Sequence, residues 1–278
     1  MKTLYVTDLD GTLLNTKDRV SEYSISTINR LIENGMLFTY ATARSLVSAS
    51  VVTQGLTFSM PVIVYNGGLV IQSKSGEVLS SIEFSRQERE KVVEVIKDNH
   101  VSPLVYSYIE GKESVSWNPC KENEGVQRYL SLRKGDRRLR PVEDNQLYEG
   151  EVFYYTCIGQ KEELLPIYES LSQDSRYRCT LAQELYREEY WCEIMPSATT
   201  KANAINKVKE LYNCDRVVAF GDATNDINMF TLADECYAVE NAVEELKKCA
   251  TGIIASNDED GVARWLEEYV RINKKVDK

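Results

Sequence analysis

The sequence is poor in the residues that many enzymes use for acid–base or redox chemistry. Histidine occurs once, at His100, directly after a helix-like stretch, so a histidine-based mechanism has little to work with. The seven cysteines are odd in number and include no Cys-x-x-Cys pair, which disfavours both a zinc site and a disulfide framework. No apolar run approaches the roughly 18 residues that a membrane-spanning helix needs.

Acidic residues outnumber basic residues by 43 to 33. The net charge of −10 disfavours nucleic acid and anionic membrane surfaces as partners, because both are polyanions. A small phosphorylated ligand is still compatible with this balance, since a bound cation can attract it locally. The first eleven residues, "MKTLYVTDLDG", lack the apolar core of a signal peptide, so we expect a cytoplasmic protein.

Strand and helix patterns alternate in the first and last parts of the chain. In the first part, apolar runs predict strands at 4–7, 36–41 and 61–68, and amphipathic patterns predict helices at 21–34 and 45–54. After Pro196 the alternation returns, with strands expected at 216–220, 236–239 and 252–255 and helices at 200–213, 225–233, 242–250 and 261–273. This order predicts a doubly wound, Rossmann-like parallel sheet.

The middle of the chain follows a different rhythm. Closely spaced strand patterns are expected at 104–109, 114–117, 152–158, 178–181 and 190–194, with helices at 86–99, 125–132 and 162–172. Strand pairs at this spacing predict an antiparallel sheet and hence an inserted α+β domain. We therefore expect an α/β fold with a core domain at 1–82 and 191–278, interrupted by the α+β domain at 83–190.

Small polar and charged side chains follow most of the predicted core strands. The carboxyl ends of parallel strands meet at one edge of an open sheet, where ligands bind. The residues expected there are Asp8, Asp10, Thr12, Thr42, Arg44, Asn66, Asp222, Asn225 and Asp226, with Lys201 opening the helix before the strand at 216–220.

The carboxylates of this set indicate a metal site. Asp8, Asp10, Asp222 and Asp226 offer hard oxygen ligands, which suit Mg²⁺. A divalent cation would also relieve the repulsion between neighbouring carboxylates.

The remaining residues indicate phosphate chemistry. Thr42 can donate its hydroxyl to an anion at a strand end, and Lys201 supplies a positive charge. A carboxylate beside a cation and a lysine stays ionised, so Asp8 could attack phosphorus and form an aspartyl-phosphate. Asp10 could then protonate the leaving group and later activate water.

Four motifs in order resemble those of the haloacid dehalogenase superfamily of phosphohydrolases. These are "DLDGTLL" at 8–14, "ATAR" at 41–44, Lys201 and "GDATNDINMF" at 221–230. The chain is most similar to the Cof-like subfamily, and the resemblance covers nearly its whole length. It implies that the inserted domain is a class-two α/β cap.

The resemblance also implies roles for individual residues. Asp8 is the nucleophile and a Mg²⁺ ligand, and Asp10 is the general acid/base that binds the metal through its backbone carbonyl. The other implied roles are phosphoryl binding by Leu9, Thr42 and Ala43, neutralisation by Lys201, Mg²⁺ ligation by Asp222, phosphate contact by Asn225, support of the metal by Asp226, and a place near the substrate for Arg44 and Asn66. Ala43 stands where the family usually has glycine, but it retains the N–H donor.

Together these features predict a Mg²⁺-dependent phosphatase that acts on small phosphorylated metabolites through a phospho-Asp8 intermediate. Sugar phosphates are the first expectation for the substrate, and pyridoxal phosphate or flavin mononucleotide are further candidates. A sugar phosphomutase of the same superfamily is one alternative. A phosphometabolite-binding regulator without catalysis is another, although the intact Asp8, Asp10, Lys201 and Asp222 argue against it.

Overall fold

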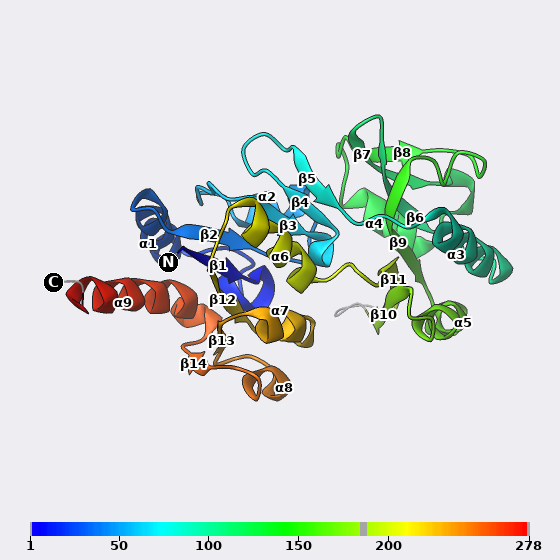
Figure 1. The fold of residues 1–278 in the computed structure, drawn as a ribbon. Helices are drawn as coiled ribbons and strands as arrows, with labels where there is room; N and C mark the ends of the chain where they lie inside the picture. The colour runs from blue at the N-terminus through cyan, green and yellow to red at the C-terminus, as the bar shows by residue number, and fades with distance from the viewer. Residues whose placement is uncertain (1, 184–187, 277–278) are drawn as a thin grey trace. The chain divides into compact units, whose positions relative to one another are not determined.

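The chain forms two compact units (Figure 1). The computed structural model describes residues 2–183 and 188–276. The first unit combines Met1–Ser81 with Thr200–Lys278, and the second is Ile82–Thr199. The second unit ends at Thr199 rather than at the expected residue 190. The reason is β11 (Tyr190–Pro196), which pairs with two other strands of the second unit.

A five-stranded parallel sheet lies at the centre of the first unit. Its order is β14-β13-β12-β1-β2. The strands are β1 (Thr3–Thr7), β2 (Leu37–Tyr40), β12 (Arg216–Gly221), β13 (Glu235–Val239) and β14 (Gly252–Ile254). The interior strand β1 is almost wholly buried, as its unbroken apolar run predicts for a strand covered on both faces. The expected α/β fold is confirmed.

Helices of the first unit connect these strands. They are α1 (Glu22–Glu33), α2 (Leu46–Val52), α6 (Lys201–Leu211), α7 (Ile227–Leu232), α8 (Glu244–Lys247) and α9 (Gly261–Val276), with short turns η1 (Leu9–Leu13), η2 (Tyr65–Gly67), η4 (Thr224–Asp226) and η5 (Asn257–Glu259). Side-chain oxygens of Ser21, Ser45 and Thr200 cap α1, α2 and α6 at their N-termini.

The third expected strand of the parallel sheet behaves differently. β3 (Val62–Val64) meets β2 through a single parallel bridge, Ala41 to Ile63. It pairs antiparallel with β4 (Leu69–Ile71), which in turn pairs with β5 (Val78–Ser81). β4 and β5 were not predicted, because such short strands carry little periodic signal.

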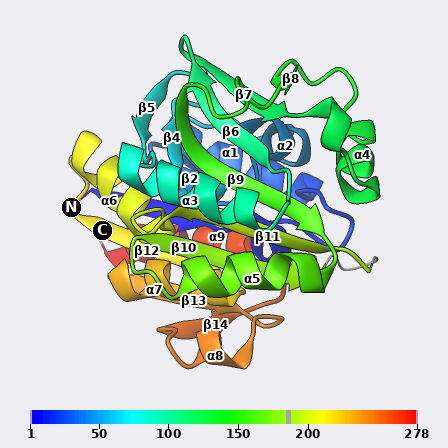
Figure 2. The same cartoon turned by 90° about the vertical axis from the view of Figure 1, so that its right-hand side faces the viewer.

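The second unit contains a six-stranded sheet in the order β10-β11-β9-β6-β7-β8. Besides β11 its strands are β6 (Leu104–Ile109), β7 (Lys112–Trp117), β8 (Leu139–Pro141), β9 (Glu151–Gly159) and β10 (Tyr177–Gln183), and its helices are α3 (Arg86–Asp98), α4 (Glu124–Ser131), α5 (Lys161–Ser172) and η3 (Pro119–Lys121). Neighbouring strands are antiparallel except β7 and β8. Figure 2 shows α3 and α5 on the same face of this sheet, where their apolar side chains build the core of the unit.

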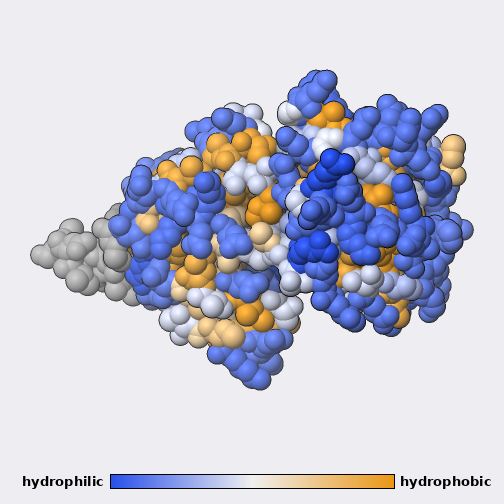
Figure 3. Space-filling model, turned by 45° about the vertical axis from the view of Figure 1, so that its right-hand side comes forward, coloured by the Kyte–Doolittle hydropathy of each residue, from blue (hydrophilic) through white to orange (hydrophobic). Residues whose placement is uncertain are grey.

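The surface of the protein is mainly hydrophilic. In Figure 3 hydrophilic residues dominate the visible face, and apolar residues are interspersed in smaller areas. The seven cysteines are free thiols in the structure. Within the described part of the chain, no helix combines the length and apolar character required to cross a bilayer.

Candidate active site

A buried lysine joins two carboxylates at the carboxyl edge of the parallel sheet. Asp8 follows β1, and its N–H continues the ladder by donating to the Phe220 carbonyl at 2.9 Å. Lys201, the first residue of α6, places Nζ 2.5 Å from Asp8 Oδ1 and 2.6 Å from Asp226 Oδ1. Lys201, Asp8 and Asp226 are all buried. A buried ammonium group requires such partners, because burial strips it of water.

Asp226 also shapes the backbone of the fourth motif. Its Oδ2 accepts hydrogen bonds from the backbone N–H groups of Asp222 at 3.0 Å and Ala223 at 3.2 Å. A Cβ on Gly221 would lie 2.6 Å from that oxygen, so the glycine permits the close approach. One carboxylate thus orients Lys201 and fixes the turn that carries Asp222.

Asp222 is held against the first motif. The Thr12 hydroxyl donates to Asp222 Oδ1 at 2.9 Å. Gly11 has φ +72°, and a Cβ there would lie only 2.3 Å from Asp222 Oδ2. Gly11 is therefore needed both for its left-handed backbone and for the space that Asp222 occupies.

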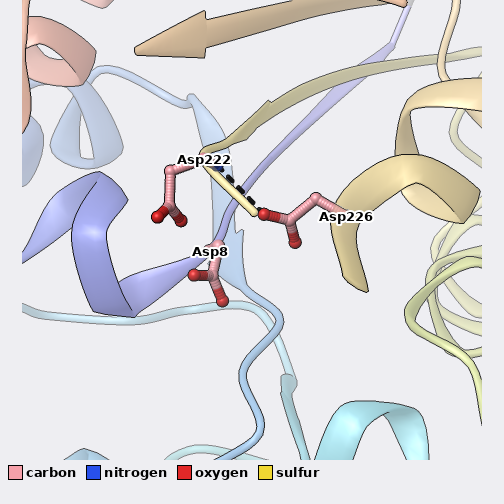
Figure 4. Close-up of side chains that lie close together, drawn as sticks. All are labelled: Asp8, Asp222 and Asp226. Carbon is pink, nitrogen blue, oxygen red and sulfur yellow. Dashed lines mark hydrogen bonds between the residues drawn. The ribbon is translucent and has the colours of Figure 1, made fainter. Parts of the chain in front are cut away.

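Three carboxylates converge on one point. One oxygen from each of Asp8, Asp222 and Asp226 lies within 4.8 Å of the others, and Figure 4 shows the three side chains gathered there. An all-oxygen donor set fits Mg²⁺. The carboxylate of Asp10 lies outside this group of described residues, so its expected role as a metal ligand depends on its backbone carbonyl and stays a prediction.

Burial dominates the electrostatics of this group. Burial raises the pKa of Asp8 to about 8, although Lys201 acts in the opposite direction. Burial likewise raises the pKa of Asp222 to about 6. Burial would lower the pKa of Lys201, but Asp8 and Asp226 outweigh it and raise that pKa. Lys201 offsets part of the cost of burying the Asp8 carboxylate, and a cation beside the carboxylates would complete the charge balance.

The phosphate-binding residues expected on the neighbouring segments lie at the same edge. Thr42 is buried, and its hydroxyl oxygen accepts the Arg44 N–H at 3.1 Å, which leaves the hydroxyl proton to donate elsewhere. The Thr42 carbonyl accepts the Asn66 N–H at 2.8 Å. Asn225 Nδ2 lies 3.4 Å from Asn66 Oδ1, at the limit of a hydrogen bond. The first, second and fourth motifs thus frame one site within the first unit.

Arg44 has partners that the sequence did not predict. Its Nε donates to both carboxylate oxygens of Asp10, at 3.0 and 2.9 Å, and its Nη2 contacts Asp10 and Asp18, each at 2.5 Å. We expected Arg44 near the substrate, but its guanidinium group pairs with these carboxylates here. Sequence reasoning missed Asp18, because the polar turn at 15–19 carries no sign of which side chain Asp18 will contact.

Comparison with known proteins agrees with this geometry. The family model of haloacid dehalogenase-like hydrolases matches residues 5–266. The chain is 26% identical to the 5-amino-6-(5-phospho-D-ribitylamino)uracil phosphatase YwtE of Bacillus subtilis, over 95% of this chain and 96% of that protein. It is 27% identical to a second Bacillus subtilis protein of the same name, YitU, over 96% of this chain and 97% of that protein.

Solved structures show the same fold. A haloacid dehalogenase-like hydrolase from Bacteroides thetaiotaomicron matches with a TM-score of 0.77 and 27% identity, over 97% of this chain and all of that one. A protein from Thermotoga maritima matches with a TM-score of 0.78 and 28% identity, over 96% and 97% of the two chains. The chain therefore belongs to the haloacid dehalogenase-like hydrolases and, as its motifs predict, is a phosphoric monoester hydrolase of the Cof-like subfamily.

Proposed function

We propose that the protein is a Mg²⁺-dependent phosphatase that hydrolyses small phosphorylated metabolites through a phospho-Asp8 intermediate. The observation that carries this proposal is the buried Lys201–Asp8 pair beside Asp222 and Asp226. Asp8, Asp222 and the backbone carbonyl of Asp10 would hold the metal ion. The bound ion would supply positive charge that lowers the repulsion between the nucleophile and the phosphate.

The residues divide the chemistry between them. A carboxylate oxygen of Asp8 attacks phosphorus, and Asp10 gives a proton to the departing oxygen. Asp10 then takes a proton from the water that attacks the aspartyl-phosphate. Donors from Leu9, Thr42 and Ala43 would bind the phosphoryl oxygens and stabilise their charge in the transition state.

Small sugar and polyol phosphates are the proposed substrate class. Both Bacillus subtilis relatives are named for a substrate with a phosphorylated ribityl chain, that is, a phosphate monoester on a polyol. A more distant relative, 23% identical, is a pyridoxal phosphate phosphatase of Escherichia coli. Pyridoxal phosphate should therefore be tested in the same phosphate-release assay. The cytoplasmic location expected from the sequence stays a prediction.

A phosphate-release assay with matched variants tests the proposal. Wild type with Mg²⁺ should release phosphate from p-nitrophenyl phosphate and from members of a sugar phosphate panel, whereas Asp8→Asn and chelated wild type should not. Asp98→Asn, which changes an exposed carboxylate on α3, serves as the control and should retain wild-type rates. Undiminished turnover by Asp8→Asn would contradict the mechanism, and isomerised sugar phosphate in place of free phosphate would support the phosphomutase instead.

A further inference from the structure

Arg44 connects two carboxylates that come from separate turns of the chain. Asp10 belongs to η1 after β1, Asp18 to the loop before α1, and Arg44 to the loop after β2. Nε and Nη2 of Arg44 both contact Asp10, and Nη2 also contacts Asp18. We call this set of three residues the Asp10–Arg44–Asp18 clamp.

The backbone of Arg44 is anchored on both sides. Its N–H donates to the Thr42 hydroxyl oxygen at 3.1 Å, and its carbonyl accepts the Tyr65 N–H at 3.0 Å. The remaining guanidinium nitrogen, Nη1, lies 3.3 Å from Ser48 Oγ. The arginine is thus held at its backbone and at its guanidinium group, so it can act as a fixed support for whatever carboxylate it binds.

The clamp is better suited to orienting a side chain than to stabilising the fold. The side chains of Asp10 and Asp18 are 50% and 61% exposed, and exposed ion pairs contribute little to the free energy of unfolding. A forked arginine contact, in contrast, defines the plane of the carboxylate that it binds, which a single lysine contact does not.

We propose that Asp18, acting through Arg44, is a positioning residue that orients the Asp10 carboxyl group for proton transfer. This inference rests on the proposed function, in which Asp10 is the general acid/base. The contacts with Arg44 are unequal for the two carboxyl oxygens of Asp10. Oδ1 accepts from both Nε and Nη2 of Arg44, whereas among the described residues Oδ2 accepts from Nε alone.

Transfer of the phosphoryl group to Asp8 forms one bond to phosphorus and breaks another. A lone pair of an Asp8 carboxylate oxygen forms the new bond to phosphorus, and the bond between phosphorus and the leaving oxygen breaks with its electron pair on that oxygen. A proton on the Asp10 carboxyl group moves to the leaving oxygen, and Asp10 becomes a carboxylate. A misaligned Asp10 therefore matters most when the leaving oxygen is strongly basic.

Two aryl phosphates of similar size separate this role from phosphate binding. p-Nitrophenolate is a stable leaving group, whereas phenolate is strongly basic and needs the proton. The assay compares kcat/KM for p-nitrophenyl phosphate and phenyl phosphate in wild type, Asp18→Asn and Arg44→Lys. Asp174→Asn is the matched control, because Asp174 also binds an arginine through a fork, but in the second unit.

We expect both clamp variants to lose about tenfold in kcat/KM for phenyl phosphate and less than about twofold for p-nitrophenyl phosphate, since a positioned acid contributes about 10²–10⁴-fold in all. The control should match wild type on both esters. Equal losses on the two esters through a raised KM would overturn the inference in favour of phosphate binding by Arg44. Unchanged values for Asp18→Asn would overturn it as well.

A crystal structure of Asp18→Asn gives a readout that does not depend on turnover. We expect the Asp10 carboxyl group to lose its contacts with Arg44 Nε and Nη2 or to adopt more than one orientation. An Asp10 side chain that keeps its contacts with Arg44 in this variant would overturn the inference. Failure of the proposed function would instead appear in wild type, as absence of Mg²⁺-dependent phosphate release, and is thus distinguishable.

Discussion

Lys201 Nζ lies 2.5 Å from Asp8 Oδ1, although 193 positions separate the two residues in the sequence. The pair brings the start of α6 to the end of β1 and sets a positive charge against the proposed nucleophile, Asp8. Both residues are buried, so neither charge has water as an alternative partner.

Removing the lysine charge should cost both stability and activity. Lys201→Met leaves Asp8 and Asp226 buried without their counter-charge, and breaking a buried pair in this way costs about 3–5 kcal/mol. Denaturant unfolding at neutral pH measures the loss, and phosphate release should fall to background. Lys207→Met, a half-buried lysine on the same helix, is the control and should change the free energy of unfolding by less than about 1 kcal/mol. A Lys201→Met protein as stable as the control would refute the argument.

Gly11→Ala should weaken the metal site through a steric clash. The new Cβ would lie 2.3 Å from Asp222 Oδ2, so that carboxylate must move. Gly76→Ala is a closely matched control, because Gly76 has φ +74° against +72° for Gly11 and nothing lies within 4 Å of its added Cβ.

Both glycine variants should lose about 1 kcal/mol of stability from backbone strain. Only Gly11→Ala should need a higher Mg²⁺ concentration for half-maximal phosphate release. Equal Mg²⁺ requirements in the two variants would show that Asp222 accommodates the methyl group.

Asp222 and Asp226 should respond differently to the same substitution. Asp222→Asn removes one of three mutually repelling carboxylates, so the metal-free protein should unfold at a higher denaturant concentration than wild type. Added Mg²⁺ should stabilise wild type but not this variant, because a ligand stabilises only the state that binds it.

Asp226→Asn should instead destabilise the metal-free protein. Asp226 binds Lys201 and two backbone N–H groups, so the substitution breaks a buried ion pair and disturbs a turn. Unfolding curves with and without Mg²⁺ compare the two variants. The assignment of Asp222 as ligand and Asp226 as support fails if Asp226→Asn alone abolishes the effect of Mg²⁺.

Glu193 on β11 should make stability depend on pH in the second unit. Burial raises the pKa of this carboxyl group above its usual value, against hydrogen bonds from Tyr154 and Thr180 that lower it. The folded protein therefore holds the proton more tightly than the unfolded chain does. The contribution of Glu193 to stability is fully retained below the pKa of about 4.3 that a glutamate has in the unfolded chain. It is lost as pH rises through the higher pKa of Glu193 in the folded protein.

Glu193→Gln removes this titration, so its stability relative to wild type should increase as pH rises above about 4.3. Glu151→Gln changes an exposed glutamate on β9 of the same sheet. The free energy of unfolding of this variant should differ from that of wild type by a constant amount over that pH range. Denaturant unfolding between pH 4 and 8 makes the comparison. If the free energies of unfolding of Glu193→Gln and wild type differ by a constant amount over this pH range, the prediction is wrong.

Much of the fold could be predicted because its signals are local. The unbroken apolar run of β1 and the amphipathic pattern of α1 each indicate one element type, and the alternation of such elements indicates a parallel sheet. β4 and β5 were missed because three or four residues leave no period to read. The boundary at residue 190 was placed too early because the pattern of β11 does not say which sheet it joins.

The sequence by itself determined the candidate site residues and the edge of the sheet at which they gather. Asp8, Asp222 and Lys201 follow from strand ends and motif spacing, because parallel strands bring their carboxyl ends together. Only the tertiary structure decided how these residues share their contacts. Asp226 supports Lys201 and a turn, Thr12 and Gly11 face Asp222, and Arg44 binds Asp10 and Asp18. Such pairings depend on side-chain distances of a few ångströms between remote segments, and no local pattern encodes those distances.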